Sequence, residues 1–230
     1  MKKLNFIGIG GATNVELGGN CCYLKDGSNL LIIDMCESAT EKLLKEGAFK
    51  NIKNIYVVIT HTHFDHVAGL GVFVWYCNFN LNIRPKIIYS NFKYKYHIKK
   101  ILKLTGVSKK YVEFIKDSSF KMNNLKLSMQ LTTHTSKLQC FGIMFQDKQG
   151  KYYYTGDTND IDYITKLCED KTVKKIYTEV STKSHDSHIA YDALVNLKKE
   201  KLVLMHFDTI ELYNKAKKDG FEIASEKEWY

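Results

Sequence analysis

One short stretch, residues 60–66 (THTHFDH), constrains this chain more than any other. It follows directly on the apolar run at residues 55–59, which predicts a buried strand, and a helix-like segment begins at Val67. The turn carries four side chains that can bind a metal: His61, His63, Asp65 and His66. Because imidazole and carboxylate ligands suit zinc and its first-row neighbours, this stretch predicts a metal site at the end of a strand.

Length and composition indicate an ordinary soluble protein. The chain has 230 residues, of which 44% are apolar and 26% charged. We expect one domain over residues 1–230, because no linker, repeat or composition break divides the sequence. No apolar run approaches the roughly 18–20 residues of a membrane span, and the N-terminus does not resemble a signal peptide. Six scattered cysteines without CxxC spacing predict free thiols, and hence a cytoplasmic location.

The net charge of +9 favours an anionic partner. Arg84 is the only arginine, so nearly all of this charge comes from lysine, which offers a point charge but no bidentate fork. A lysine-rich composition alone can produce the same excess. The sequence therefore leaves open whether the basic charge is functional or compositional.

Local patterns predict a strand-rich, layered α/β fold. Helices are expected at residues 38–45, 67–79, 93–104, 161–168, 188–198 and 211–218. Strands are expected at residues 3–10, 21–24, 29–34, 55–59, 86–90, 111–116, 125–131, 141–146, 151–154, 175–178 and 202–205. The helix at 67–79 is hydrophobic all round, which predicts burial on every side, and strands 111–116 and 125–131 are expected to be antiparallel.

Further candidate ligands follow other predicted strands. His134, Asp157 and His206 each come after one, as the histidine turn does. Open α/β sheets place their sites at the carboxyl ends of strands, so these donors can converge on one edge. Seven donors exceed the needs of one metal, and we expect two ions with Asp157 as the bridge.

Taken together, these elements resemble the metallo-β-lactamase superfamily. The resemblance rests on the 60–66 turn, the later His134, residues 155–158 (TGDT) and residues 205–207 (MHF), and it spans nearly the whole chain. It implies an αββα sandwich with two divalent ions, Zn²⁺ or alternatively Mn²⁺, at one edge. His61, His63 and His134 would hold the first ion; Asp65, His66 and His206 the second; Asp157 would bridge. Flavodiiron members have Glu where this chain has His63, which favours a hydrolase.

Within the superfamily the chain is most similar to ribonuclease Z-like phosphodiesterases. Residues 8–11 and 31–34 resemble that group, and Glu179 and His188 resemble its orienting carboxylate and proton donor. Thr178 departs from the family pattern, which has histidine there. In this interpretation Asp65 orients a hydroxide held between the ions, and His188, or else His185, protonates the leaving oxygen.

The segment between His134 and Asp157 is filled by one predicted hairpin, so the RNA-binding arm of transfer-RNA processing enzymes is missing. We therefore expect a phosphodiesterase for a small anionic phosphodiester, either a cyclic nucleotide or a short nucleic-acid end. The alternatives are an acyl hydrolase of the lactonase or thioesterase type, and an endoribonuclease that processes transfer-RNA 3′ ends. We also expect a homodimer, with the aromatic stretch 73–76 as core or as a dimer face.

Overall fold

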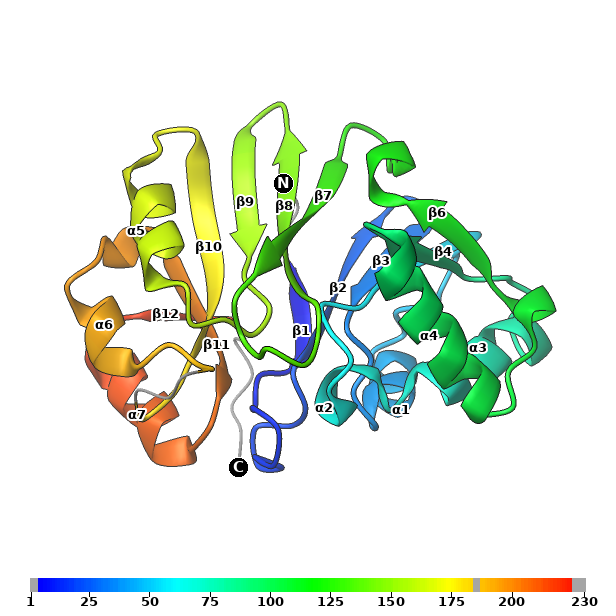
Figure 1. The fold of residues 1–230 in the computed structure, drawn as a ribbon, viewed down its shortest axis with the longest axis horizontal. Coiled ribbons are helices and arrows are strands. Elements are labelled where there is room, and N and C mark those ends of the chain that lie inside the picture. The colour runs from blue at the N-terminus through cyan, green and yellow to red at the C-terminus, as the bar shows by residue number, and fades with distance from the viewer. Residues whose placement is uncertain (1–3, 184–186, 225–230) are drawn as a thin grey trace.

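Two six-stranded sheets face each other, with helices on the outer face of each (Figure 1). The computed structural model describes residues 4–183 and 187–224. The sheet orders are β1-β2-β3-β4-β5-β6 and β12-β11-β10-β9-β8-β7, so the two halves of the chain build one sheet each. This arrangement confirms the αββα sandwich of the metallo-β-lactamase type.

In the middle of each sheet, the observed strands lie close to the ranges predicted from the sequence. The first sheet contains β1 (Asn5–Gly8), β2 (Cys21–Asp26), β3 (Asn29–Ile33), β4 (Asn54–Val58), β5 (Lys86–Tyr89) and β6 (Glu113–Lys116). The second contains β7 (Lys126–Thr132), β8 (Cys140–Asp147), β9 (Gly150–Tyr154), β10 (Val173–Val180), β11 (Leu202–Phe207) and β12 (Glu222–Ile223). Central strands such as β3 are continuously apolar because parallel strands are covered on both faces.

The helices begin where the sequence supplies caps. They are α1 (Ala39–Lys45), α2 (Phe64–Val67), α3 (Leu70–Phe79), α4 (Phe92–Leu104), α5 (Ile161–Glu169), α6 (Tyr191–Val195) and α7 (Ile210–Lys218). The side chains of Asn91, Asp160 and Thr209 accept hydrogen bonds from backbone N–H groups at the starts of α4, α5 and α7. Within the described residues no helix is long and apolar enough to cross a membrane.

Strand direction gathers the polar turns at one edge of the sandwich. β3 and β4 are parallel, so their carboxyl ends, followed by Asp34 and by the histidine turn, lie together. In the second sheet, β7 and β9 both run antiparallel to β8 and therefore point the same way. β9, β10 and β11 are parallel, which brings their ends to the same edge. The strand-end donors predicted from the sequence thus share one location.

The single helix predicted at residues 67–79 is divided in the structure between α2 and α3. The prediction that this helix is buried on every side is wrong. Gly69 lies between α2 and α3, and it packs closely on the chain at Cys36, since a Cβ there would lie 2.2 Å from the carbonyl oxygen of Cys36. Val72, Trp75 and Phe79 are 67%, 48% and 66% exposed on one face of α3. A homodimer through this face stays a prediction, which sedimentation equilibrium would test.

Two further expectations differ from the structure. Strands β6 and β7 are not an antiparallel pair: β6 pairs in parallel with β5, and β7 pairs with β8 in the other sheet. The helix predicted at residues 188–198 is only α6, so His188 lies in the extended segment before it. Both errors concern non-local pairing, which periodicity does not encode.

Candidate metal centre

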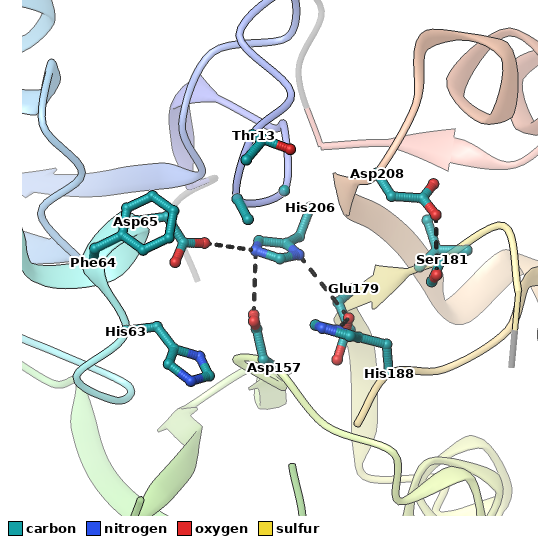
Figure 2. Close-up of a pocket in the computed structure, with 13 residues that line it drawn as sticks. Thr13, His63, Phe64, Asp65, Asp157, Glu179, Ser181, His188, His206 and Asp208 are labelled. Atoms are coloured by element: carbon teal, nitrogen blue, oxygen red, sulfur yellow. Dashed lines mark hydrogen bonds and ion pairs between the residues drawn. The ribbon is translucent and has the colours of Figure 1, made fainter. Parts of the chain in front are cut away.

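The structure brings all seven predicted metal donors together. They form two groups that share Asp157, and in each group the ligand atoms lie within 4.8 Å of one another. The first group is His61, His63, His134 and Asp157; the second is Asp65, His66, Asp157 and His206. Figure 2 shows four of them, His63, Asp65, Asp157 and His206, converging from different elements.

The first group is built from three imidazole nitrogens. Nδ1 of His63 lies 2.9 Å from Nε2 of His61 and 3.2 Å from Nε2 of His134. Oδ2 of Asp157 lies 3.7 Å from His61 Nε2 and 3.8 Å from His134 Nε2. Ligands about 2.0–2.1 Å from a tetrahedral zinc are separated by about 3.3 Å, so this spacing suits one ion.

The second group uses the other oxygen of the same aspartate. Oδ1 of Asp157 lies 3.4 Å from Nε2 of both His66 and His206. Oδ2 of Asp65 lies 3.1 Å from His66 Nε2 and 3.4 Å from His206 Nε2. Because Asp157 turns one oxygen toward each group, its carboxylate has the geometry of a bridge.

Two buried atoms show that the donors fit a metal. Neither His66 Nε2 nor Asp157 Oδ1 makes a hydrogen bond with any described residue, although both are fully buried. Such atoms are costly unless a partner satisfies them. Nitrogen and carboxylate ligands are those that zinc and its neighbours prefer, so the clusters are consistent with a binuclear metal site.

Charge within the cluster also suits cations. Burial raises the pKa of Asp157, but the imidazoles of His206, His66 and His61 outweigh it and hold that pKa well below its usual range. Burial, together with the neighbouring His66, lowers the pKa of His61, which keeps it in the neutral, ligating form. Although burial opposes it, Asp157 raises the pKa of His66 and His206, so metal binding there must release protons.

Left-handed backbone conformations orient two of the donors, Asp157 and His206, toward the cluster. Gly156 has φ 60°, and a Cβ on it would lie 2.8 Å from the carbonyl oxygen of Phe141, so only glycine fits the turn that presents Asp157. His206 adopts φ 54°, a left-handed conformation that non-glycine residues seldom adopt. Such strain, on the order of 1 kcal/mol or more, is tolerated where the surrounding structure fixes it.

Asp34 is a site residue to which the sequence analysis gave no role. It is fully buried at the end of β3, and its Oδ2 accepts a hydrogen bond from His66 Nδ1 at 2.9 Å. Its Oδ1 accepts the backbone N–H of Thr60 at 2.6 Å. Because Nδ1 of His66 is the donor, Nε2 is left with its lone pair toward the cluster. An acidic residue ending a buried strand beside the histidine strand is the signal that could have found it.

Replacing Asp34 with asparagine should weaken binding of the ion held by His66 by about 10- to 100-fold. The amide preserves the shape and can still accept from Thr60, but it no longer fixes the His66 tautomer. Titration of metal-free protein against a chromophoric chelator measures the effect, with circular dichroism to verify folding. Unchanged affinity for both ions would show that Asp34 serves the fold alone.

Glu179 and His188 form a pair at the edge of the cluster. His188 Nδ1 donates to Glu179 Oε2 at 2.5 Å, and the backbone N–H of Thr158 donates to Oε1. Burial and the nearby charge of Asp157 raise the pKa of Glu179. His188 packs against two ligands, with ring centroids 4.8 Å from His134 and 6.0 Å from His206.

The other predicted proton-donor candidate, His185, lies outside the described residues. Its segment leads to Ser187, whose carbonyl oxygen accepts from His134 Nδ1 at 2.6 Å. That bond leaves Nε2 of His134 free for the first group. Ser187, next to His188, thus orients a predicted ligand.

A cavity of about 320 Å³ opens onto the donors. Its lining includes four predicted metal ligands together with Glu179 and His188 (Figure 2). The rest of the lining comes from the loop after β1, the start of α2 and the ends of β10 and β11: Gly11, Ala12, Thr13, Phe64, Val180, Ser181 and Asp208. The predicted catalytic and metal-binding side chains therefore face one small pocket.

Comparison with known proteins agrees with this architecture. The metallo-β-lactamase fold protein YhfI from Bacillus subtilis is 17% identical, with 96% of this chain and 94% of that chain covered and a TM-score of 0.74. A diphosphatase from the PhnP family is 18% identical, with 96% and 94% covered and a TM-score of 0.70. The short form of human tRNase Z is 17% identical, with 99% and 97% covered and a TM-score of 0.66. At such identities the likeness shows the fold alone.

A match at family level goes further. No curated protein sequence matches the chain. The family model described as anti-Pycsar protein Apyc1, however, matches residues 2–230. That range includes the histidine turn, every other predicted donor and the Glu179–His188 pair. The chain therefore belongs to the anti-Pycsar Apyc1 family and is a metallo-hydrolase of the metallo-β-lactamase fold.

Proposed function

We propose that this protein is a di-metal phosphodiesterase that opens the cyclic phosphodiester of a cyclic nucleotide. The observation that carries the proposal is the Glu179–His188 pair, because it places a proton donor in the same cavity as the two donor groups. Membership of a cyclic nucleotide-degrading family supports the substrate class.

The seven donors would hold two divalent cations, zinc or alternatively manganese. Such cations, when bound, neutralise charge on the phosphate and lower the pKa of a water molecule toward neutrality. His61, His63 and His134 would hold one ion, Asp65, His66 and His206 would hold the other, and Asp157 would contribute to both. Asp65 also lines the cavity, where its carboxylate can accept a hydrogen bond from the attacking water and orient it.

His188 supplies the proton that the leaving group needs. Opening a cyclic phosphodiester expels an alkoxide, which leaves poorly unless it is protonated as the bond breaks. Glu179 accepts Nδ1–H of His188, which fixes the orientation of the ring. His188 Nε2 makes no hydrogen bond within the described part of the chain, and His188 lines the cavity, so that nitrogen is available to a substrate.

The size of the site favours a small substrate. A cavity of about 320 Å³ is at the lower end of the range for small-molecule sites. The chain between His134 and Asp157 is used by β8 and β9, which form a hairpin within the second sheet. A formal charge of +9 is consistent with an anionic phosphodiester.

A substrate panel tests the proposal. Protein stripped of metal and reloaded with Zn²⁺ or Mn²⁺ should convert 3′,5′-cyclic AMP to a nucleoside monophosphate, and chelation should abolish the activity. The panel also contains a γ-lactone, a short single-stranded oligonucleotide and a transfer-RNA precursor. Turnover of the lactone without phosphodiester cleavage would establish the acyl-hydrolase alternative. Faster cleavage of the transfer-RNA precursor than of the cyclic nucleotide would establish the endoribonuclease.

A further inference from the structure

An exposed phenylalanine lines the mouth of the metal cavity. Phe64 is the first residue of α2 and is 60% exposed. It lies between His63 and Asp65, two of the predicted ligands, and its side chain lines the same cavity (Figure 2). Among the described residues that line this cavity, it alone carries a phenyl, phenol or indole ring. No aromatic ring of the described chain packs against it, so the fold itself does not use this surface.

The lining contributed by the loop after β1 is made of small side chains. Gly11, Ala12 and Thr13 line the cavity there, and a Cβ on Gly11 would lie 3.1 Å from two atoms of the His206 ring. The loop therefore packs tightly on the ligand while its small side chains leave the space above the donors open. A flat group can enter this space beside Phe64.

The carboxylate of Asp208, which lines the cavity, is already occupied. Asp208 Oδ2 accepts hydrogen bonds from Ser181 Oγ at 3.0 Å and from the backbone N–H of Thr182 at 2.7 Å. Its Oδ1 accepts from Thr182 Oγ1 at 2.8 Å. The rim carboxylate thus ties two loops together. A ligand at the mouth therefore meets the exposed ring of Phe64 beside a carboxylate that the fold already uses.

We propose that Phe64 is the stacking platform for the nucleobase of the cyclic nucleotide, an inference that rests on the proposed function. With the phosphate at the donors, the base extends from the ribose toward the cavity mouth, where Phe64 lies. Stacking on an aromatic side chain accepts any base because every base has a π face. Phe64 therefore sets affinity for the base, whereas Asp157, His188 and their partners act on the phosphate.

The test compares substitutions of Phe64 and of Phe92, each measured on a substrate that carries a base and on one that does not. Phe92 is a matched control, since it is also the first residue of a helix, is 80% exposed and does not line the cavity. F64A should lower kcat/KM for 3′,5′-cyclic AMP by about tenfold, mainly through KM, which is the size of one lost base stack. F64W should stay near wild type, F64L should resemble F64A, and F92A should not differ from wild type.

The second substrate is a methyl riboside 3,5-cyclic phosphate, which has the same diester and no base. On this substrate, the kcat/KM of F64A should lie within about twofold of the wild-type value. An equal loss on both substrates would overturn the inference, because Phe64 would then only position its neighbouring ligands. An equal loss in F64A and F92A on cyclic AMP would overturn it as well.

A binding measurement separates this inference from the proposed function. Calorimetry of metal-loaded protein with cyclic AMP should show about tenfold weaker binding to F64A than to wild type. If wild type binds cyclic AMP without cleaving it, the phosphodiesterase assignment fails while weaker binding to F64A still supports the platform. If wild type and F64A bind equally, or neither binds, the platform is overturned.

Discussion

Replacing Asp157 with asparagine should reduce cyclic nucleotide turnover by at least about 10³-fold. Asp157 directs Oδ2 toward the first donor group and Oδ1 toward the second, so it is the one side chain that both groups share. An amide keeps the size but offers one oxygen and no charge. Losing several kcal/mol of charge stabilisation in the transition state corresponds to about three orders of magnitude in rate.

Metal content gives this prediction a second readout. Wild-type protein should retain two ions per chain by plasma mass spectrometry after gel filtration, and D157N fewer. D160N is a matched control, because Asp160 caps α5 only three positions away, where asparagine serves equally well. Two ions and undiminished turnover in D157N would contradict the bridging role. A similar loss in D160N would point instead to general damage of this loop.

The strand-end rule explains why so much of the centre was predictable. Each donor follows a run that had to be a strand, and parallel strands deliver their carboxyl ends to one edge. Residues 60–66, His134, Asp157 and His206 therefore needed no knowledge of the fold to be grouped. The hairpin of β8 and β9 is a local feature, and it too was predicted from the sequence.

What the sequence concealed depends on contacts between distant elements. Asp34 acquires its role only because β3 lies beside β4, which places its carboxylate behind His66. The all-round hydrophobicity of residues 70–79 does not reveal that, among the described residues, Val72, Trp75 and Phe79 are left exposed on one face of α3. β6 and β7 are near in sequence, yet each finds its partner in a different sheet. In each case tertiary pairing, not local propensity, decides.

The pairing of Glu179 with His188 was predicted in part: the sequence located the two residues but not the backbone path that joins them. The residues are separated by nine positions, and the structure joins them at 2.5 Å although His188 is not on the predicted helix. β10 delivers Glu179 to the same edge as the ligands, and an isolated bridge between Ser181 and Ala190 brings the chain back beside it. The resemblance located the two residues, but only the backbone path shows how they meet.

Replacing His188 with alanine should reduce turnover by an amount that depends on the leaving group of the substrate. Turnover of 3′,5′-cyclic AMP, which expels an alkoxide, should fall by about 10²- to 10⁴-fold, the usual contribution of a positioned acid. Turnover of thymidine 5′-p-nitrophenyl phosphate should fall less than about tenfold, because p-nitrophenolate leaves without a proton. Metal content should remain at two ions, since His188 belongs to neither of the two donor groups that share Asp157 but to a third group with His134 and Glu179.

Three companion variants decide how the proton reaches the substrate. E179Q should show the same substrate selectivity with a smaller loss, because glutamine can still accept the backbone N–H of Thr158 but holds the His188 ring less firmly than a carboxylate does. H97A, on α4 and away from the cavity lining, should behave as wild type. If H185A rather than H188A loses activity selectively on cyclic AMP, the donor is His185. If H188A loses equal activity on both substrates, His188 supports the ligand His134, against which it packs, and does not deliver a proton.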